Sequence, residues 1–339
     1  MCKNKIVKIT IGIILYKNTK YLQKCLQSLL KQTHENFELL LRDQDENGFE
    51  ALEFLKKNYP EILKDSRVKI FSGKNLWHSC GQNFLFSEMS ENSDAYLCAS
   101  NDMLYEKDCI EKLVENLNKN LEYSVAVPKL KRWDFENSRD KNKNFGKTNF
   151  IDSCGIGLFE NHHFFDIGQA EKDIGQYDNN KEIFGGSGAL FLARKSALEK
   201  IDFFDENLHY KNDIDLAYRL QWAGEKTCFV SSAIAFHERQ ICNSGNKKPL
   251  WVKESSFFGH LILLYKNVYR NNFPFSVKFK IFWYIFRVTG FLLLTEPKVL
   301  LQYVKFFRLI FSGNLLEKKK NMHAVKKISA IQILKFCKK

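Results

Sequence analysis

The sequence predicts an α/β fold, with a mostly parallel sheet flanked by helices, followed by a helical and basic C-terminal extension. Short apolar strands alternate with amphipathic helices through the first part of the 339-residue chain. The formal charge is +13, yet residues 251–339 hold 17 Lys and Arg against 3 Asp and Glu, whereas residues 1–250 hold 35 against 36. We therefore expect a neutral sheet domain over 1–240 and a basic helical region over 241–339.

The strand and helix pattern repeats from the N-terminus. Residues 7–14 alternate as a strand, and Leu22, Leu26, Leu29 and Leu30 share one face of the helix that follows. Further strands are expected at 37–41, 68–71, 95–99 and 124–127, and further helices near 50–58, 81–89 and 110–117. After an irregular stretch over 129–184, helices are expected at 195–201 and 214–223 and strands at 227–230 and 233–236. Such units form a right-handed parallel sheet that binds ligands at the carboxyl ends of its strands.

Composition excludes several classes of protein. Hydrophobic residues make up 45% and charged residues 27%, which excludes wholesale disorder and a polytopic membrane protein. The nine cysteines are scattered and form no Cys-x-x-Cys pair, which argues against a disulfide framework and a zinc finger. The first residues lead directly into a strand pattern without an apolar secretory stretch, so we expect a cytoplasmic protein.

Acidic residues follow two of the expected strands. Asp43 and Asp45 come after the second strand, and Asp102 comes after the fourth. A carboxylate there can contact a nucleotide or hold a divalent cation, although Asp is also a common turn residue. Tyr16-Lys17-Asn18 follows the first strand where a phosphate-binding glycine loop would stand, which disfavours a dinucleotide-binding domain or a P-loop ATPase.

The densest cluster of polar motifs lies between Gly185 and His237. Its glycines, in Gly185-Gly186-Ser187-Gly188, either admit a ligand close to the backbone or simply form a turn. Asp213 precedes a helical pattern and is either an N-cap or a general base. His237 ends a strand and is either structural or a metal ligand.

Taken in order, these motifs resemble family 2 glycosyltransferases of the GT-A fold, in particular the rhamnosyltransferase-like and galactofuranosyltransferase-like branches. The similarity runs from about Val7 to His237 and is most specific in Gly-Ser-Gly-Ala, Phe-Asp-Glu, Asp-Ile-Asp-Leu, Arg219, Gly224 and the terminal His. The segment Asn75 to Asn83 resembles the family's Asn-x-Gly…Gly-x-Asn loop, and the first strand ending at Tyr16 resembles its usual start.

The resemblance implies a role for each matching residue. Asp43 would contact the nucleotide base, Asp102 and His237 would bind a divalent cation (Mn or Mg), and Asp213 would deprotonate the acceptor. The remaining donor-binding candidates are Tyr16, Asn75, Asn83 and Asn101, and the candidates for the acceptor and donor loop are Gly186, Ser187, Gly188, Asp215 and Arg219. A single base opposite the leaving group implies single displacement with inversion.

Two positions depart from the family pattern. Ser100-Asn101-Asp102 leaves one carboxylate where many relatives have two, so the cation would depend more on His237. Asn212 stands where the Glu of a Glu-Asp pair is expected, which removes a like charge that would raise the pKa of Asp213.

The C-terminal region is rich in apolar and basic residues. Residues 281–295, interrupted by Arg287, fall short of the ~20 residues that span a bilayer. From Lys298 onward, polar residues recur on one helical face, as in a helix that lies in a membrane interface; Lys298, Gln302, Lys305, Arg308 and Ser312 form this face. The alternative is a helical subdomain packed on the sheet domain. Nucleic-acid binding is not expected, because the sheet domain is neutral and the basic part carries a wide apolar stripe.

We therefore expect a metal-dependent, inverting glycosyltransferase that moves a sugar from a nucleotide diphosphate to a glycan or lipid-linked glycan. It would act in surface polysaccharide or glycolipid biosynthesis, peripherally bound to the anionic cytoplasmic face of the inner membrane through the C-terminal arm. Two alternatives stay open: a catalytically weakened sugar-nucleotide binding protein, and a basic protein that binds lipid or nucleic-acid surfaces.

Overall fold

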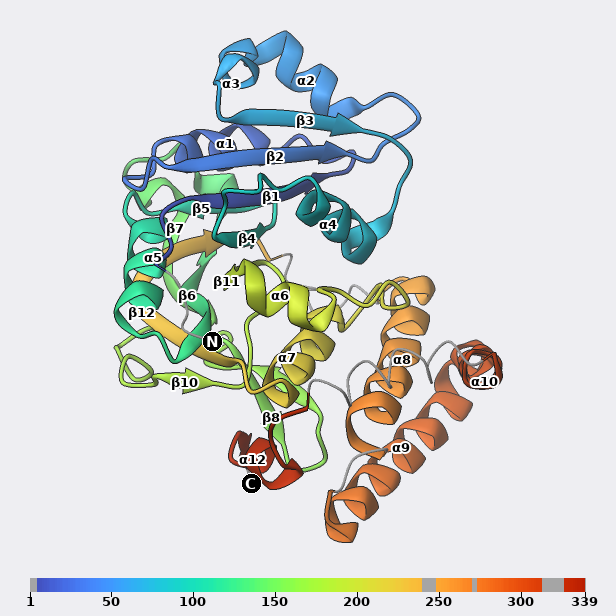
Figure 1. Ribbon diagram of the computed structural model, residues 1–339. Helices are drawn as coiled ribbons and strands as arrows, with labels where there is room; N and C mark the ends of the chain where they lie inside the picture. Colours follow the sequence, from blue (N-terminus) through green and yellow to red (C-terminus); the bar gives the residue numbers. More distant parts are fainter. Residues whose placement is uncertain (1–4, 240–247, 270–272, 313–325, 339) are drawn as a thin grey trace.

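The computed structural model describes residues 5–239, 248–269, 273–312 and 326–338. Its centre is a 10-stranded sheet in the order β10-β12-β6-β11-β4-β1-β2-β3, with β5 paired to β12 and β7 paired to β6. The strands β4, β1, β2 and β3 are parallel throughout, and helices cover both faces of the sheet (Figure 1). The predicted α/β class is confirmed.

The first half of the chain follows the predicted alternation closely. Helix α4 is the main difference, because it begins at Trp77 rather than Gly81, just after a turn in which Asn75 accepts the amide of Trp77. The elements are β1 (Ile9–Leu15), α1 (Leu22–Leu30), β2 (Phe37–Asp43), α2 (Glu50–Asn58), α3 (Pro60–Lys64), β3 (Val68–Ser72), α4 (Trp77–Ser87), β4 (Ala95–Ala99), β5 (Met103–Tyr105) and α5 (Cys109–Lys119).

Two hydrophobic cores lie on opposite faces of the sheet. Alternate residues of β1, such as Ile9, Ile11 and Ile13, point into the core beneath α1 and α5. Neighbouring positions in β4 point the other way, where Tyr96 and other buried residues pack under α4, α6 and α7. Because both faces are covered, the strands read as nearly continuous apolar runs.

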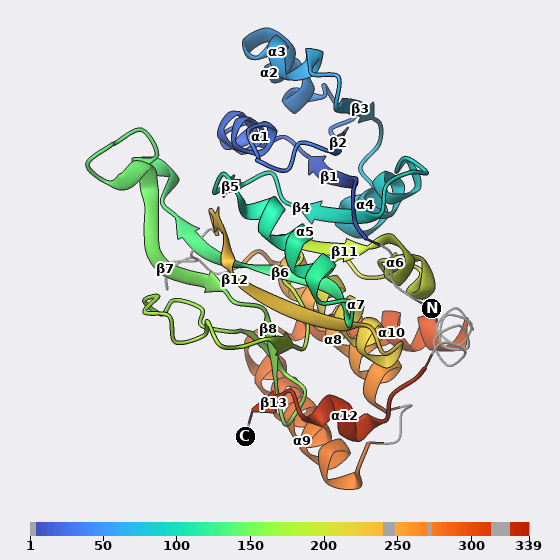
Figure 2. The same cartoon turned by 60° about the vertical axis from the view of Figure 1, so that its left-hand side comes forward.

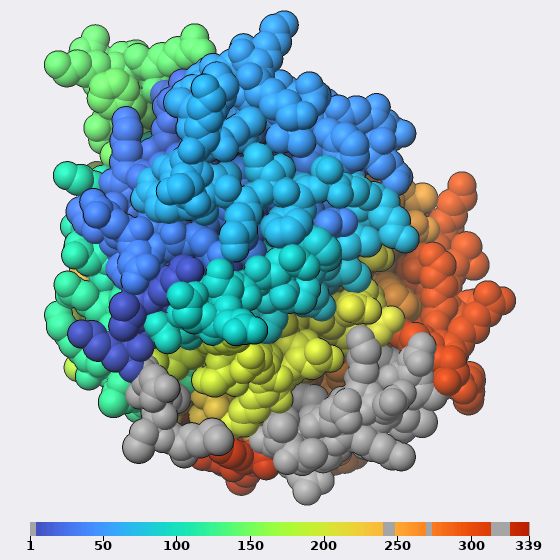
Figure 3. Space-filling model, turned by 45° about the horizontal axis from the view of Figure 1, so that its top comes forward, coloured from blue at the N-terminus to red at the C-terminus, as the bar shows by residue number. Residues whose placement is uncertain are grey.

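The prediction of an irregular stretch over 129–184 was wrong in part, because five strands run through it, although most of its residues lie outside them. Polar residues in this stretch obscure the alternation of apolar and polar positions by which a strand is recognised in a sequence. These strands are instead defined by pairing with strands that are distant in the sequence. Strand β6 (Tyr123–Trp133) extends past the predicted 127, and then follow β7 (Lys147–Ser153), β8 (Ile156–Phe159), β9 (Phe164–Asp166) and β10 (Glu182–Ile183). The connection from β6 to β7 projects from the molecule (green in Figures 2 and 3).

The elements after β10 carry the motifs that lie between Gly185 and His237. They are β11 (Leu190–Arg194), α6 (Lys195–Ile201), α7 (Asn212–Trp222) and β12 (Lys226–His237). The two strands predicted at 227–230 and 233–236 are one strand, β12, whose register with β6 shifts between Val230 and Ile234. This irregularity bends the strand, so that His237 at its end pairs with Met103 beside Asp102.

The C-terminal region is helical, as predicted, and packs on the sheet domain. Its elements are α8 (Leu250–Leu264), a π-helical turn (Tyr265–Tyr269), α9 (Phe275–Thr295), a 3₁₀ turn (Pro297–Leu301), α10 (Gln302–Phe311), α12 (Ala330–Leu334) and β13 (Cys337–Lys338). Gly259 in α8 lies so close to Tyr210 that an added Cβ would come within 2.5 Å of its carbonyl oxygen. The chain end returns to the sheet domain, where β13 pairs with β8 (Figure 2). The division at residue 240 therefore marks a change in charge, and the two parts share contacts.

A buried ionic network joins the two parts. Lys266, in the π-helical turn, contacts Asp205 at 2.5 Å and Asp215 of α7 at 3.0 Å. Arg219 pairs with Asp215 at 2.7 Å and donates to the carbonyl of Ile201. Asp215 is fully buried, so its charge is compensated from within the protein.

We predict that Lys266→Met lowers the free energy of unfolding by about 3–5 kcal/mol, because buried Asp205 loses the Lys266 cation and buried Asp215 keeps Arg219 but loses Lys266. Urea unfolding measures this change. Lys57→Met, on the exposed side of α2, is the matched control and should stay within about 0.5 kcal/mol of the parent. An equal effect of the two substitutions would show that the network contributes nothing to stability.

Candidate active site

Asp102 and His237 meet at the carboxyl ends of β4 and β12. The Nε2 atom of His237 lies 3.5 Å from Oδ1 of Asp102, and its Nδ1 atom lies 2.8 Å from Oδ2 of Asp152. Burial lowers the pKa of His237, but the hydrogen bonds to Asp102 and Asp152 outweigh it and raise this pKa to about 9. Two carboxylates thus converge on one imidazole, an arrangement that favours a positive charge there, either a proton on the ring or a metal ion that takes the place of the Nε2 proton.

The pair Asp102 and His237 fits a divalent cation. Adjacent ligand atoms around such an ion are about 3 Å apart, close to the 3.5 Å observed here between Nε2 and Oδ1. Among the described residues, no cluster of three or more His, Cys, Asp or Glu side chains is arranged to hold a metal ion. A cation held by this pair would keep further coordination positions open, as magnesium sites do when they bind substrate phosphates.

Sequence reasoning missed Asp152 and Arg239. Asp152 lies on β7, in the stretch expected to be irregular, and is fully buried. Arg239 forms ion pairs with Asp152 at 2.9 Å and with Asp166 at 2.7 Å. The only local signal was the arginine two residues after His237, because Asp152 and Asp166 reach this site through strand pairing alone.

Asp213 is anchored at the first turn of α7. Its Oδ2 atom accepts the backbone amide of Gly188 at 3.1 Å, and its Oδ1 atom accepts the amide of Ile214 at 2.9 Å. The helix begins at Asn212, with Lys211 in the left-handed cap position, so the N-cap role considered for Asp213 is wrong. Burial raises the pKa of Asp213, the charge of Asp166 adds to this rise, and the two amides oppose it.

The two halves of the site are joined through the sheet. Strand β11 pairs with β4, and the amide of Ser100 donates to the carbonyl of Ala189 at 2.9 Å. Ala189 follows Gly188, whose amide binds Asp213, and the Ser100 hydroxyl donates to Oδ1 of Asp102 at 2.6 Å. A short series of contacts therefore links Asp213, the expected base, to Asp102, the expected metal ligand.

Asn212, the departure from the family pattern, has a specific partner. Its amide nitrogen lies 2.9 Å from Nδ1 of His78 and 3.0 Å from Oγ of Ser79. Burial lowers the pKa of His78 to about 4, so its ring is neutral and accepts the amide proton. A glutamate carboxylate could not donate this proton. The expected loss of a like charge beside Asp213 is offset by burial and by Asp166, which keep its pKa raised.

The glycine segment serves close packing. A Cβ at Gly185 would lie 2.3 Å from Cβ of Ala217, and one at Gly186 would lie 2.6 Å from a methyl of Val127. Gly188 presents its amide to Asp213, and the Ser187 hydroxyl accepts the amide of Ala189 at 3.4 Å. The glycines thus bring the chain close to α7 and β6, and Gly188 thereby holds the carboxylate of Asp213.

The donor-binding candidates are placed at the expected strand ends, with different exposure. Tyr16 is 43% exposed just after β1, and Asn101 is half-buried in the turn before Asp102. Asp43 ends β2 but is fully buried, and its oxygens accept the amides of Asp45 at 3.0 Å and Leu52 at 2.9 Å. The structure thus shows Asp43 holding the start of α2.

Two further asparagines bind the protein backbone. Asn75 shapes the turn before α4. Asn83 exchanges two hydrogen bonds with the backbone of Phe204, at 2.9 and 3.0 Å, which attaches α4 to the Phe204-Asp205 segment. Asp215 and Arg219, predicted for the acceptor and donor loop, lie inside the protein in the network around Lys266, out of reach of a substrate.

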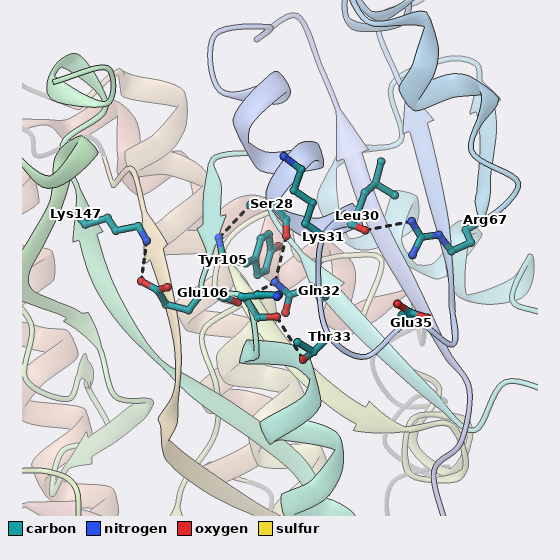
Figure 4. A pocket seen from close by; sticks show the side chains of 11 residues that line it. Ser28, Leu30, Lys31, Gln32, Thr33, Glu35, Arg67, Tyr105, Glu106 and Lys147 are labelled. Atoms are coloured by element: carbon teal, nitrogen blue, oxygen red, sulfur yellow. Dashed lines mark hydrogen bonds and ion pairs between the residues drawn. The ribbon is translucent and has the colours of Figure 1, made fainter. Parts of the chain in front are cut away.

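A large hollow of about 1080 Å³ lies at the opposite end of the sheet. It is lined by residues that precede β2 and β3, such as Thr33 and Arg67, whereas the candidate active site lies at the carboxyl ends. Figure 4 shows its side chains bonded to one another: Lys147 pairs with Glu106 at 2.8 Å, and Arg67 donates to the carbonyl of Leu30. The hollow is therefore separate from the chemistry described above.

Comparison with known families settles the relationship that the motifs suggested. Residues 10–202, more than half of the chain, match the family described as Glycosyl transferase family 2. This protein belongs to glycosyl transferase family 2. The matched span of this family 2 protein includes the Asp102 turn and the Gly186–Gly188 segment, whereas Asp213 and His237 lie beyond it.

Solved structures share the fold of this family 2 protein. GalNAc-T7 with UDP, GalNAc and Mn²⁺ is 13% identical, with a TM-score of 0.58 over 77% of this chain and 48% of that one. TarS of S. aureus is 14% identical, with a TM-score of 0.55 over 92% and 49%. The mannosyltransferase PcManGT from Pyrobaculum calidifontis, in complex with GDP-Man and Mn²⁺, is 13% identical, with a TM-score of 0.51 over 98% and 88%.

These likenesses confirm the expected GT-A fold. At 13–14% identity they show the fold alone. The chain spans about half the length of GalNAc-T7 and of TarS, at 48% and 49%. The mixed sheet with helices on both faces and the C-terminal helices agree with what the sequence predicted.

We predict that Asn212→Leu lowers the free energy of unfolding by about 1–3 kcal/mol, because it leaves the buried Nδ1 of His78 without its donor. Adding His78→Phe should recover part of this loss, since both members of the pair are then apolar. A double-mutant cycle followed by urea unfolding measures the coupling. Strictly additive effects would show that the two side chains do not act together.

Proposed function

We propose that this protein transfers a sugar from a nucleotide diphosphate to a hydroxyl group of a glycan or lipid-linked glycan, with inversion at the anomeric carbon. The observation that carries the proposal is the carboxylate of Asp213, fixed by the amides of Gly188 and Ile214 and linked through Ser100 to Asp102. This transfer needs a base and a cation site, and here they are linked from the first turn of α7 to the ends of β4 and β12.

Asp213 acts as the general base. Its raised pKa brings it nearer to the range in which a carboxylate can take a proton effectively. The acceptor oxygen bonds to the anomeric carbon, the bond from that carbon to the phosphate oxygen breaks on the opposite face, and the acceptor proton passes to Asp213. The nucleoside diphosphate leaves with the electron pair of the broken bond.

Asp102 and His237 would hold the divalent cation, Mn or Mg. When bound, the ion neutralises the charge that develops on the departing diphosphate. Asp152 positions His237 by accepting its Nδ1 hydrogen bond, and Arg239 balances the charge of Asp152. The presence of Mn²⁺ in the GalNAc-T7 and PcManGT structures supports this part of the proposal.

The proposal of a particular type of glycosyltransferase rests on the resemblance of the sequence motifs to two branches of the family. We infer a hexosyltransferase of the rhamnosyltransferase-like or galactofuranosyltransferase-like type, acting in surface polysaccharide or glycolipid biosynthesis. The related structures hold different nucleotides, UDP in one and GDP-Man in another, so the fold leaves the choice of nucleotide open. Tyr16, Asn75 and Asn101 remain candidates for donor contacts, and Ser187 remains a candidate for the acceptor and donor loop.

We infer that the C-terminal helices bind the cytoplasmic face of an anionic membrane. The outer face of α9 exposes large apolar side chains, with Phe275 81%, Phe286 60% and Trp283 52% exposed. Such a surface is unusual for a protein that meets only water. In Figure 3 these helices, in orange and red, form a ridge at one edge of the molecule. No helix in the described part of the chain is long and apolar enough to cross a bilayer.

The predicted amphipathic helix is present, but its faces differ from the prediction. Gln302, expected on the polar face of α10, is buried together with Phe306, whereas Lys305 and Arg308 are exposed as expected. Among the described C-terminal helices, the exposed aromatic residues lie mainly on α9. An anionic surface would attract the exposed basic residues by about 1 kcal/mol each. Exposed aromatic side chains beside them favour a lipid surface over nucleic acid.

We predict that Asp213→Asn lowers the rate of sugar transfer by about 10²–10⁴-fold, because the acceptor loses its base. Release of the nucleoside diphosphate with a panel of donors and Mn²⁺ measures this rate, and EDTA should abolish the release.

Because burial raises the pKa of Asp213, activity should fall as the pH drops through a value above the ordinary aspartate range. Asp202→Asn, at an exposed left-handed position that asparagine tolerates, is the control. Turnover that survives Asp213→Asn would remove Asp213 as base, and a protein that binds donors without turnover would be a sugar-nucleotide binding protein.

We predict that replacing Phe279, Trp283 and Phe286 together by Ser weakens binding to anionic vesicles at least tenfold, because exposed aromatic area no longer enters the interface. Co-sedimentation measures binding, and the melting temperature should hardly change, since these side chains are exposed. Phe150→Ser with Ile174→Ser, two exposed apolar residues away from α9, is the matched control. Undiminished vesicle binding by the α9 variant would contradict the membrane role of this face.

A further inference from the structure

A second cavity, of about 300 Å³, lies between the segment before α7 and the C-terminal helices. Lys211 and Tyr210 form one wall, His260 of α8 forms another, and Tyr284, Val288 and Leu292 come from the inner face of α9. Lys211 caps α7, two residues before Asp213, and the charges of the two side chains interact. Asp213 does not itself line the cavity, but Lys211 places one wall at the start of the helix that carries the proposed base.

The cavity is basic. Lys211, Lys248, Lys253, His163 and His260 line it, and none of the described lining residues is acidic. Lys253 is paired with Glu296, whereas the Nζ atom of Lys211 lies 5.5 Å from the centre of the Phe164 ring and forms no ion pair with a carboxylate of the described residues. Burial, and then the charge of Lys248, lower the pKa of Lys211 to about 7. Burial and the charge of Lys211 lower the pKa of both His163 and His260.

His260 points to a ligand. Its side chain is only 4% exposed, and neither ring nitrogen has a hydrogen-bond partner in the described structure. A buried polar group without a partner costs about 1–3 kcal/mol, so such groups are rare in folded proteins. An anion in the cavity would supply an acceptor for His260 and compensate the charge of Lys211 at the same time.

We propose that this cavity binds a phosphate or diphosphate group carried by the acceptor, and so holds the acceptor beside Asp213. The proposal rests on the function proposed above and names the chemistry of its acceptor. The donor diphosphate is separate, since it belongs with Asp102 and His237. Sugars linked to lipids through phosphate and phosphorylated soluble glycans both carry this group.

The structure favours a lipid as the carrier of the phosphate. Helix α9 lines the cavity with Tyr284 and Val288, while its outer face carries the exposed Phe282 and Trp283. A phosphate held in the cavity would therefore lie one helix away from the surface proposed to enter the membrane. A lipid chain could stay in the bilayer while its phosphate is bound.

The test measures binding of inorganic pyrophosphate to the full-length protein by calorimetry, with EDTA present to silence the cation-dependent donor site. Lys211→Met and His260→Phe should each raise the dissociation constant at least tenfold, because each removes a charge-assisted or buried hydrogen bond. Lys57→Met should leave it unchanged. His260→Phe should not lower the melting temperature of the ligand-free protein, since it removes an unpartnered polar group, so loss of folding cannot explain its effect.

Absence of pyrophosphate binding by the parent protein, or equal binding by both cavity variants, would overturn the proposal. Donor turnover by the parent is measured in parallel. If the parent protein turns over a donor but both variants bind pyrophosphate as tightly as the parent, the phosphate site in the cavity is refuted and the proposed function stands. If the parent turns over no donor, the proposed function is refuted.

A second arm identifies the carrier. Phosphatidylcholine vesicles with a small fraction of polyprenyl diphosphate are compared with vesicles of equal charge that contain phosphatidylglycerol. Stronger binding to the polyprenyl diphosphate that Lys211→Met abolishes supports a lipid-linked acceptor. Equal binding to both, unaffected by Lys211→Met, assigns the phosphate to a soluble acceptor and contradicts the lipid carrier.

Discussion

The buried contacts of Lys266 with Asp205 and Asp215 are the constraint on which the arrangement of this protein depends. Both carboxylates belong to the sheet domain, and the cation that compensates them comes from the C-terminal region. Removing charges from water is favourable only when partners are held in good geometry, so the two regions must dock in one way. Asp215 is also two residues from Asp213, which couples this docking to the position of the proposed base.

Contact between the two regions also explains how one chain can combine a nearly neutral sheet domain with a basic C-terminal region. The sheet domain is close to neutral, so an anionic donor would be held by a local cation at Asp102 and His237 rather than by bulk positive charge. The excess positive charge lies in the C-terminal region, whose inner surface contributes His260 to a basic cavity beside the site. The outer surface of the same region carries exposed aromatic residues on α9. A single helical layer thus faces the proposed acceptor cavity on one side and the proposed membrane surface on the other.

The candidate active site shows which contacts Asn212 makes at a position where the family resemblance predicts a glutamate. Asn212 replaces an expected glutamate, and its amide binds a neutral His78, which holds the Asn75–Asn83 segment against the start of α7. Asp213 keeps a raised pKa through burial, without a neighbouring glutamate. Residues that resemble donor ligands in sequence, such as Asn83, hold backbone in place instead. Motif similarity identified the candidate residues, but it did not distinguish side chains that would contact a substrate from side chains that hold the surrounding backbone in place.

The sequence by itself determined the alternation of strands and helices, the family, the strand ends at which Asp102 and His237 stand, and the division of charge. These features are local, because hydrophobic periodicity and motif spacing are written within short stretches of chain. Tertiary structure alone decided that five strands run through 129–184, that Asp152 and Arg239 support His237, and that Asp215 is buried. Those outcomes depend on partners far away in sequence, and a side chain carries no local sign of which distant group will compensate its charge.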